Sequence, residues 1–282
     1  MTLKFKKNET FYIRDGWVEK TINALDETKS NIFFKNNGIK VLGIGSNMVK
    51  GLKYWVKAAN IVSDDKNCTM TEFSKLLLQY DRYMDQSFSW FFLHYYLSTN
   101  KEECPIFYEM FSLNNGITKF KKNELLEYLL DQFSSEEQLY RKYVENDLNI
   151  FIKSYVNEDV LSNPEENFVC PLSSLKLIKK VNDHYEKTKP TYSSLSYLIV
   201  YYALYKLYAE KNVNSFDIED SMNVPESPAN IFNLDKYMYL KYLDDMRKAG
   251  LVTINKTAGL NTVYFEKIMS LDKIFEEGLG NL

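Results

Sequence analysis

The chain has 282 residues, 45% of them hydrophobic, with 22 tyrosines and 18 phenylalanines, a composition that excludes an intrinsically disordered protein. Its length suffices for one large domain or for two to three small ones. The net charge of −3 is unevenly distributed, because residues 1–60 carry eleven lysines and arginines against five acidic residues, a balance of +6 that leaves the remaining chain at −9. A basic first segment on an acidic body indicates one site for an anionic partner.

A turn followed by a basic helix is the first informative feature along the chain. Apolar residues predict helices over residues 17–25 and 38–42, and glycines at positions 43 and 45 predict a tight turn after them. Ser46 is expected to cap the next helix, in which Lys50, Lys53 and Lys57 share one face. The opposite, buried face carries apolar residues at helical spacing: Met48, Val49, Leu52, Val56 and Ala59. This order of elements is typical of a helix-turn-helix, whose last helix enters the major groove of DNA.

Residues 1–70 are therefore predicted to form a helix-turn-helix-like basic region that binds DNA. Its candidate DNA-binding residues are Arg14, Ser46, Asn47, Lys50, Lys53 and Lys57. The alternative is a three-helix packing unit with a solvated lysine face, since three lysines attract phosphate but read no bases. Arg14 either makes a bidentate phosphate contact or pairs with Asp15 or Glu19. Residues 43–47 lack the complete glycine pattern of a dinucleotide site or a P-loop, so ATP or NAD use is not expected.

Residues 71–160 are predicted to form a helical domain. A polar run at residues 63–67 separates it from the basic helix, and any wing there is short. Helical patterns follow within residues 71–96, where the second helix is apolar on both faces and is expected to lie at the centre of the domain. Further helices are expected over 122–133 and 135–155, and 157–171 is the best candidate for a linker.

Two carboxylates and a histidine are the candidate catalytic groups. Asp81 and Asp85 are four residues apart and would share a face if the segment is helical, where they could hold Mg²⁺ or Mn²⁺ for phosphodiester cleavage. Alternatively, Asp81 pairs with an arginine and Asp85 caps the next helix. His94 is a candidate general acid or base, although a histidine inside an aromatic core is usually structural. His184 is expected in a polar helix.

Residues 171–282 are predicted to form a C-terminal winged-helix-like domain. Helices are expected over 193–210, 217–222 and 234–249, with Gly250 just after the last one, and strands over 251–254 and 262–265 flank a turn. Several cations could face nucleic acid here: Lys236, Lys241, Arg247, Lys248 and Lys256. Asp235, Asp244 and Asp245 dilute this charge, and winged helices also serve as protein-contact modules.

The cysteines and hydropathy indicate a cytoplasmic protein. Cys68, Cys104 and Cys170 are far apart and form neither a disulfide framework nor a zinc motif. No run of eighteen apolar residues occurs, so no membrane segment is expected.

Several segments together resemble a bacterial family catalogued as domain of unknown function 4007. They lie within residues 9–17, 42–49, 54–55, 81–85, 90–95 and 170–172, and the Leu-Gly-Ile-Gly-Ser-Asn-Met-Val stretch at 42–49 is the most specific. The resemblance implies a setting beside DNA phosphorothioation genes, with a cysteine desulfurase and a sulfurtransferase as partners. One branch of the family, the B component of the Ssp type, is associated with DNA nicking. Ser46 stands where many relatives have lysine, and the resemblance assigns no catalytic residue.

The residue patterns predict a mainly helical protein that binds DNA, and the family resemblance implies a place in a phosphorothioation-linked phage-defence system. It could also nick DNA with a carboxylate-bound Mg²⁺ or Mn²⁺. Two alternatives stay open, namely a non-catalytic adaptor that docks the sulfurtransferase or desulfurase, and a helix-turn-helix transcriptional regulator.

Overall fold

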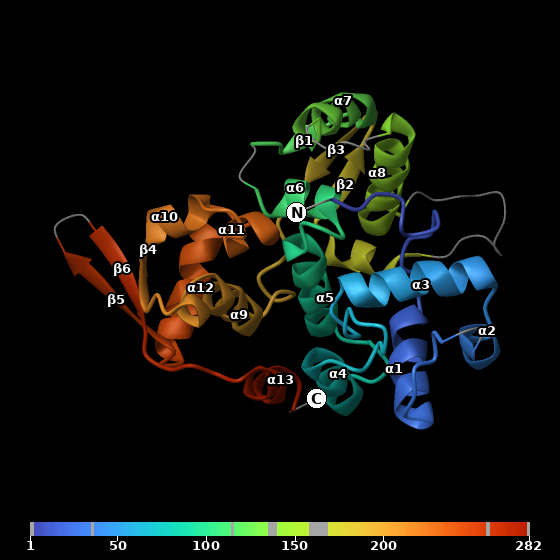
Figure 1. Ribbon diagram of the computed structural model, residues 1–282. Coiled ribbons are helices and arrows are strands. Elements are labelled where there is room, and N and C mark those ends of the chain that lie inside the picture. Colours follow the sequence, from blue (N-terminus) through green and yellow to red (C-terminus); the bar gives the residue numbers. More distant parts are fainter. Residues whose placement is uncertain are drawn as a thin grey trace.

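The computed structural model describes residues 3–34, 37–113, 116–134, 140–157, 169–257 and 260–280. Within these ranges the protein is mainly helical, and its strands form two small three-stranded antiparallel sheets (Figure 1). No described helix is both long enough and apolar enough to span a bilayer.

The first half of the chain is built from helices. They are α1 (Trp17–Thr28), α2 (Asn37–Leu42), α3 (Ser46–Ala58), α4 (Glu72–Tyr80), α5 (Ser87–Thr99), α6 (Pro105–Phe111), α7 (Lys122–Gln132) and α8 (Arg141–Tyr155). The helices expected from the sequence in this half are confirmed, whereas α6 was not predicted. The expected start of α8 near residue 135 lies outside the described residues, as does most of the linker expected over 157–171.

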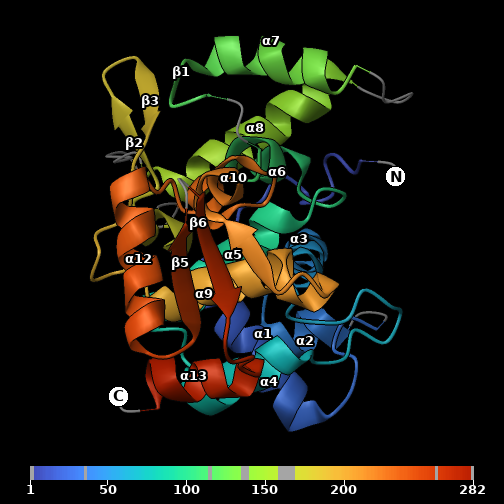
Figure 2. The same ribbon diagram turned by 90° about the vertical axis from the view of Figure 1, so that its left-hand side faces the viewer.

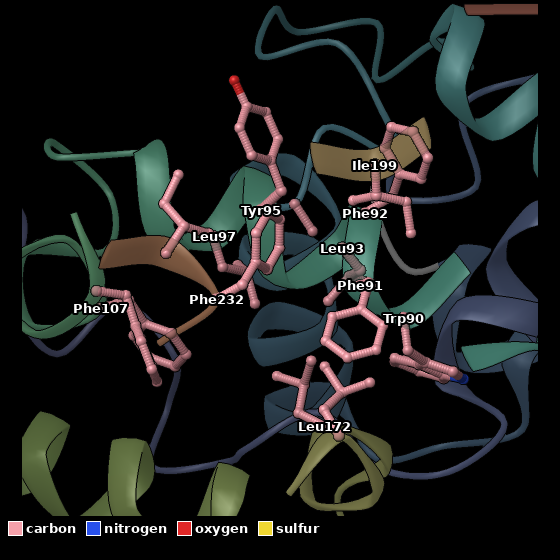
Figure 3. Close-up of a cluster of buried hydrophobic side chains, with 14 of the residues drawn as sticks. Trp90, Phe91, Phe92, Leu93, Tyr95, Leu97, Phe107, Leu172, Ile199 and Phe232 are labelled. Carbon is pink, nitrogen blue, oxygen red and sulfur yellow. The ribbon is translucent and has the colours of Figure 1, made fainter. Parts of the chain in front are cut away.

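Helix α5 forms the centre of the molecule. Ten of its side chains are buried, on every side of the helix, as its apolar sequence predicts. In Figure 3, Phe91 of α5 lies near Leu172 of a short 3-10 helix, η2 (Pro171–Leu175), while Phe92 lies beside Ile199 of α9 (Tyr197–Leu207). The core is thus shared by segments more than 100 residues apart in the chain.

The first sheet has the strand order β1-β3-β2. Its strands are β1 (Lys119–Phe120), β2 (Ile178–Val181) and β3 (His184–Lys187). The sequence predicts none of these strands. The expectation that His184 lies in a helix is wrong, because His184 begins β3 and pairs with Val181 across a two-residue turn.

In the last third of the chain, α9 is followed by a second sheet and several helices. After 3-10 helix η3 (Ala209–Lys211) come β4 (Ser215–Asp217), α10 (Ile218–Asn223), α11 (Pro228–Ile231), α12 (Lys236–Lys248), β5 (Val252–Thr257) and β6 (Leu260–Phe265). The sheet order is β4-β6-β5, and α12 runs beside β5 (Figure 2). The predicted hairpin is confirmed, as is Gly250 after α12, where its φ of 68° suits a helix end. The tip of the hairpin lies outside the described residues.

A final helix that was not predicted, α13 (Leu271–Leu279), returns the chain to the N-terminal half. It packs against α4, and Figure 2 shows the two side by side. The Phe275 ring centre lies 5.4 Å from that of Phe88 and 6.0 Å from that of Phe73. Both ends of the chain therefore contribute to a single packed structure.

Candidate nucleic-acid interface

Helix α3 presents its N-terminal end to solvent. Gly45, with extended backbone angles, is the N-cap, and no side chain caps the helix. The expectation that Ser46 is the cap is therefore wrong, because Ser46 is already the first helical residue. Ser46, Asn47 and Lys50 are exposed. The first backbone N–H groups of a helix have no partner within the helix, so they are available to an anion at this end.

The rest of α3 is covered by the N-terminal segment of the chain. A Cβ atom on Gly51 would lie 2.8 Å from the carbonyl oxygen of Asn8, so only glycine permits this approach. The Trp55 indole donates a 2.8 Å hydrogen bond to the carbonyl oxygen of Phe11. The exposed surface of α3 is consequently confined to its first two turns.

The three lysines of α3 have different surroundings. Lys50 is exposed, and its amine lies 3.4 Å from the side-chain oxygen of Asn47. Lys53 is half-buried. The Lys57 amine donates to the carbonyl oxygens of Asp64 and Asp65, at 2.7 and 3.1 Å, and lies 3.2 Å from the Asp64 carboxylate. The three lysines therefore do not form one exposed face as helical spacing predicts, because Lys57 is held by hydrogen bonds to a neighbouring loop.

The loop that binds Lys57 is organised around the Asp65 carboxylate. This group accepts hydrogen bonds from the Ser63 hydroxyl and from the backbone N–H groups of Asn67 and Cys68, at 2.8 to 3.1 Å. The bond from Ser63, followed by those from the backbone, holds the pKa of Asp65 below its usual value. The polar run considered as a short wing is therefore a compact loop that closes over the C-terminal end of α3.

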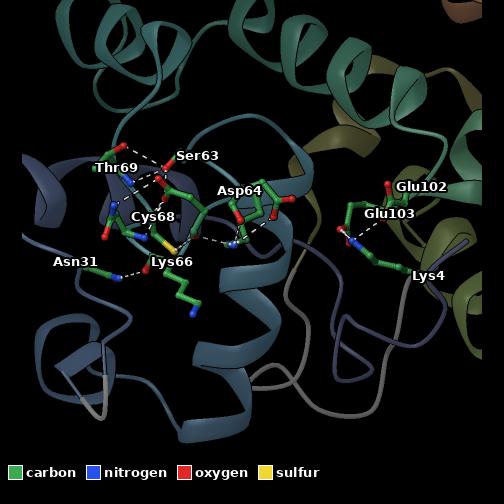
Figure 4. Close-up of polar contacts among 12 residues, drawn as sticks. Lys4, Asn31, Ser63, Asp64, Lys66, Cys68, Thr69, Glu102 and Glu103 are labelled. Carbon is green, nitrogen blue, oxygen red and sulfur yellow. Dashed lines mark hydrogen bonds and ion pairs between the residues drawn. The ribbon is translucent and has the colours of Figure 1, made fainter. Parts of the chain in front are cut away.

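Other cations of the basic N-terminal segment also have internal partners. Lys4 pairs with Glu102 and Glu103, and these bonds raise its pKa (Figure 4). The amine of Lys6 lies 5.1 Å from the centre of the Tyr143 ring. The Arg14 guanidinium is half-buried and lies over the ring of Phe11, at 5.2 Å. Several of the cations that give residues 1–60 their net charge of +6 therefore make contacts within the protein.

Asp81 and Asp85 do not share a helix face. Residues 81–86 form a turn between α4 and α5, so the helix assumed for an i, i+4 pair is absent here. Both oxygens of the buried Asp81 carboxylate accept backbone N–H groups, from Asp85 at 2.9 Å and Gln86 at 3.2 Å. Burial nevertheless raises the pKa of Asp81. Asp85 is exposed, and no side chain caps α5, so the alternative in which Asp85 caps this helix is wrong.

His94 lies completely buried at the junction of three helices. Its Nδ1 atom is 2.6 Å from the hydroxyl of Tyr155, and its Nε2 atom is 2.8 Å from the carbonyl oxygen of Ile231. Burial, partly opposed by the bond to Ile231, lowers the pKa of His94 to about 4. The imidazole is therefore neutral at physiological pH and links α5 to α8 and α11.

The cations of α12 are paired with acids or stacked on an aromatic ring. Lys236 pairs with Glu219, and Arg247 and Lys248 both pair with Asp244. The Lys241 amine lies 3.3 Å from the centre of the Tyr192 ring. The side chain of Lys256 lies outside the described residues. Between these charges α12 exposes two apolar side chains, Tyr237 at 72% and Leu240 at 39%.

Described acidic, histidine and cysteine side chains form no cluster of three that could hold a metal ion. All three cysteines are free and buried. No disulfide is therefore formed, as their spacing predicts.

Comparison with known proteins gives one family and one fold. The model for a protein of unknown function (DUF4007) matches residues 5–277. A crystal structure of magnesium ion-bound SspB superimposes with a TM-score of 0.85 at 22% identity, covering 99% of this chain and 88% of that one. A second SspB crystal structure gives a TM-score of 0.82 at 21% identity with the same coverage. No curated protein matches the sequence.

Proposed function

The chain belongs to the family of proteins of unknown function DUF4007, and on this premise we propose that it is a DNA-binding component of a phosphorothioation-linked defence system. The fold it shares with SspB supports this assignment. The observation that carries DNA binding is the exposed N-terminal end of α3, where Lys50 is accompanied by free backbone N–H groups and by the polar side chains of Ser46 and Asn47.

The arrangement of α1 to α3 supports a helix-turn-helix-like role for residues 1–70. Helix α2 contacts both α1 and α3 and so braces the helix that follows it (Figure 1). Recognition helices contact base edges with their N-terminal residues, which is the part of α3 left uncovered. Lys50 and Lys53 supply attraction to phosphate, and Ser46 and Asn47 supply groups able to bind a base or a phosphate. Arg14 is proposed as a further phosphate contact.

We further propose that residues 171–282 form a winged-helix unit that binds protein. The order of helix, strand, two short helices, long helix and hairpin, with the first strand beside the last, is that of a winged helix. In such a unit α12 would be the recognition helix. Its paired cations and its exposed Tyr237 and Leu240 favour a protein partner over DNA. The family resemblance suggests the cysteine desulfurase or the sulfurtransferase as this protein partner. A non-catalytic adaptor that docks one of these enzymes is therefore the second candidate function.

DNA nicking is a more specific hypothesis than DNA binding, and it rests on the family resemblance. The turn at Asp81 and Asp85 does not fit a divalent cation, since both oxygens of Asp81 already accept backbone N–H groups. We therefore assign no nicking step to these residues or to His94. Supercoiled plasmid incubated with the protein and Mg²⁺ or Mn²⁺ should become open circles if the protein nicks DNA, and unchanged plasmid with folded protein would reject nicking.

DNA binding is tested by measuring affinity for random duplex DNA against salt concentration. The double variant Lys50→Gln/Lys53→Gln should weaken binding at low salt and reduce the slope of log affinity against log salt by about 2, since each phosphate contact contributes about 0.9. The control Lys236→Gln/Lys248→Gln removes the same charge from α12 and should leave binding nearly unchanged.

Equal losses in the two double variants would show that only net charge matters and would reject α3 as the interface. Absence of DNA binding by the wild-type protein, together with direct binding to the desulfurase or sulfurtransferase, would favour the adaptor.

A further inference from the structure

A cavity of about 410 Å³ lies where the β1-β3-β2 sheet meets the segment joining α11 to α12. Its polar lining consists of Thr118, Lys187, Lys189, Asn230, Asn233 and Asp235. The volume lies within the range typical of small-molecule sites. None of these residues belongs to α3, so the cavity is separate from the proposed DNA interface.

Lys187, the last residue of β3, contributes to the cavity lining. Its backbone N–H donates a 2.8 Å bond to the carbonyl oxygen of Thr118, which fixes the strand end. Its side-chain amine donates to the carbonyl oxygen of Met110 at the end of α6 and lies 5.8 Å from the centre of the Phe111 ring. Burial lowers the pKa of Lys187 to about 8, and the nearby Glu109 carboxylate opposes this shift. The protonated amine is therefore held in a poorly solvated position, which an anion in the cavity would stabilise.

The other two charged residues of the lining form an ion pair with each other. Lys189 pairs with Asp235, whose carboxylate also accepts the backbone N–H of Met238 at the start of α12. Lys187 is thus the lining cation that is not paired with a lining acid. The amide nitrogen of Asn233 donates to the carbonyl oxygens of Leu177 and Thr188, at 2.9 and 3.0 Å. What Asn233 can still offer to a ligand is its carbonyl oxygen, a hydrogen-bond acceptor.

We propose that this cavity binds the phosphate monoester of a nucleotide, with the Lys187 amine on the phosphate and Asn233 accepting a hydrogen bond from the base or sugar. Lysine serves as a compact point charge for phosphate, and the volume is sufficient for one nucleotide. The phosphate comes either from a free mononucleotide or from the 5′-phosphate end of a DNA strand. The proposal does not depend on DNA binding by α3.

Calorimetric titration of the full chain with AMP, with adenosine and with inorganic phosphate tests this site. AMP should bind at least about tenfold more tightly than adenosine, the amount expected for one charge-assisted hydrogen bond. Lys187→Met should remove this preference. Lys179→Met is the matched control, because it removes the same charge from the neighbouring strand β2 outside the cavity lining.

A short oligonucleotide with a 5′-phosphate and its 5′-hydroxyl counterpart separate the two sources of phosphate. A preference for the 5′-phosphate that Lys187→Met abolishes, without binding of AMP, identifies a DNA end. The opposite pattern identifies a free nucleotide. The proposal is overturned if AMP binds no better than adenosine and the 5′-phosphate oligonucleotide binds no better than its 5′-hydroxyl counterpart. It is also overturned if Lys179→Met weakens binding as much as Lys187→Met does.

A labelling experiment on the wild-type protein covers the case in which Lys187→Met does not fold. At pH 8 a limiting amount of an amine-acylating reagent should modify Lys187, and saturating ligand should protect it selectively, as measured by mass spectrometry of peptides. Protection of Lys187 no greater than that of Lys179 would overturn the assignment.

Discussion

His94 should make the protein less stable as the pH falls below neutrality. The carbonyl oxygen of Ile231 can only accept a hydrogen bond, so Nε2 of His94 carries the proton and Nδ1 accepts from the hydroxyl of Tyr155. This neutral form uses both ring nitrogens. The charged form would be buried among aromatic rings, including that of Phe111 at 4.7 Å, and this burial lowers the pKa of His94 to about 4 from the usual 6.5.

The size of the effect follows from the difference between these pKa values. Between pH 6.5 and 4 the histidine is protonated in the unfolded chain and neutral in the folded one, so unfolding takes up a proton. The free energy of unfolding therefore decreases by about 1.4 kcal/mol for each pH unit of acidification, or about 3 kcal/mol over the whole interval. The contribution is fully present above pH 6.5 and is lost as the pH falls to 4.

Urea unfolding of the wild type and of His94→Gln at several pH values between 7.5 and 4.5 measures the contribution of His94 to the free energy of unfolding. The variant should be less stable at neutral pH, because the site is tightly packed, but its stability should decrease less steeply with acidification. His184 and the carboxylates are present in both proteins and cancel in the comparison. Parallel curves for the two proteins, or an NMR pKa near 6.5 for His94, would refute the assignment of His94 as a neutral structural link.

Three further changes probe other parts of the structure. Gly51→Ala should destabilise the protein by about 1 to 3 kcal/mol in thermal unfolding, because its Cβ would collide with the backbone of Asn8, whereas Gly45→Ala, which meets no atom within 4 Å, should cost much less. Asp81→Ala should lower the free energy of unfolding by about 1 to 3 kcal/mol, since two backbone N–H groups lose their acceptor, and an unchanged denaturation midpoint would contradict this role. AMP affinity should fall as the pH rises above about 8, where Lys187 loses its proton while the phosphate keeps its charge, and this dependence should be absent in Lys187→Met.

Apolar periodicity predicted most of the larger helices because their burial follows directly from the sequence. Helix α5 is buried on every side, and its sequence is apolar on every side. The β2-β3 hairpin was missed for the converse reason. Its strands are short and mostly polar, so no alternation of apolar residues marks them. The signal that could have found it is local, namely Asn182 and Asp183 as a two-residue turn, with Asn182 at a φ of 52°.

The partners of charged side chains were harder to predict than the helices that carry them. Helical spacing correctly placed Lys57 on α3, but its acceptors lie in a loop whose path depends on a bridge between Val62 and Met70. Likewise, the sequence places Asp81 near Asp85 without showing that α4 ends at Tyr80 and that the Asp81 carboxylate binds the backbone of the turn before α5. Such contacts depend on where each element ends, which residue patterns indicate least reliably.

The contrast between α3 and α12 shows why charge counts alone misassign interfaces. Both helices carry several cations, yet α12 meets acidic partners on its own turns and from α10, whereas the exposed start of α3 contains no acidic residue. An ion pair must be broken before its lysine can neutralise a phosphate, so a paired cation adds little to DNA affinity. By the same argument, a lysine that is not held in an ion pair remains able to attract an anion, although the nearby Glu109 carboxylate reduces this attraction at Lys187. This reasoning supports the two proposals, namely that duplex DNA binds at Lys50 and Lys53 and that a single phosphate binds at Lys187.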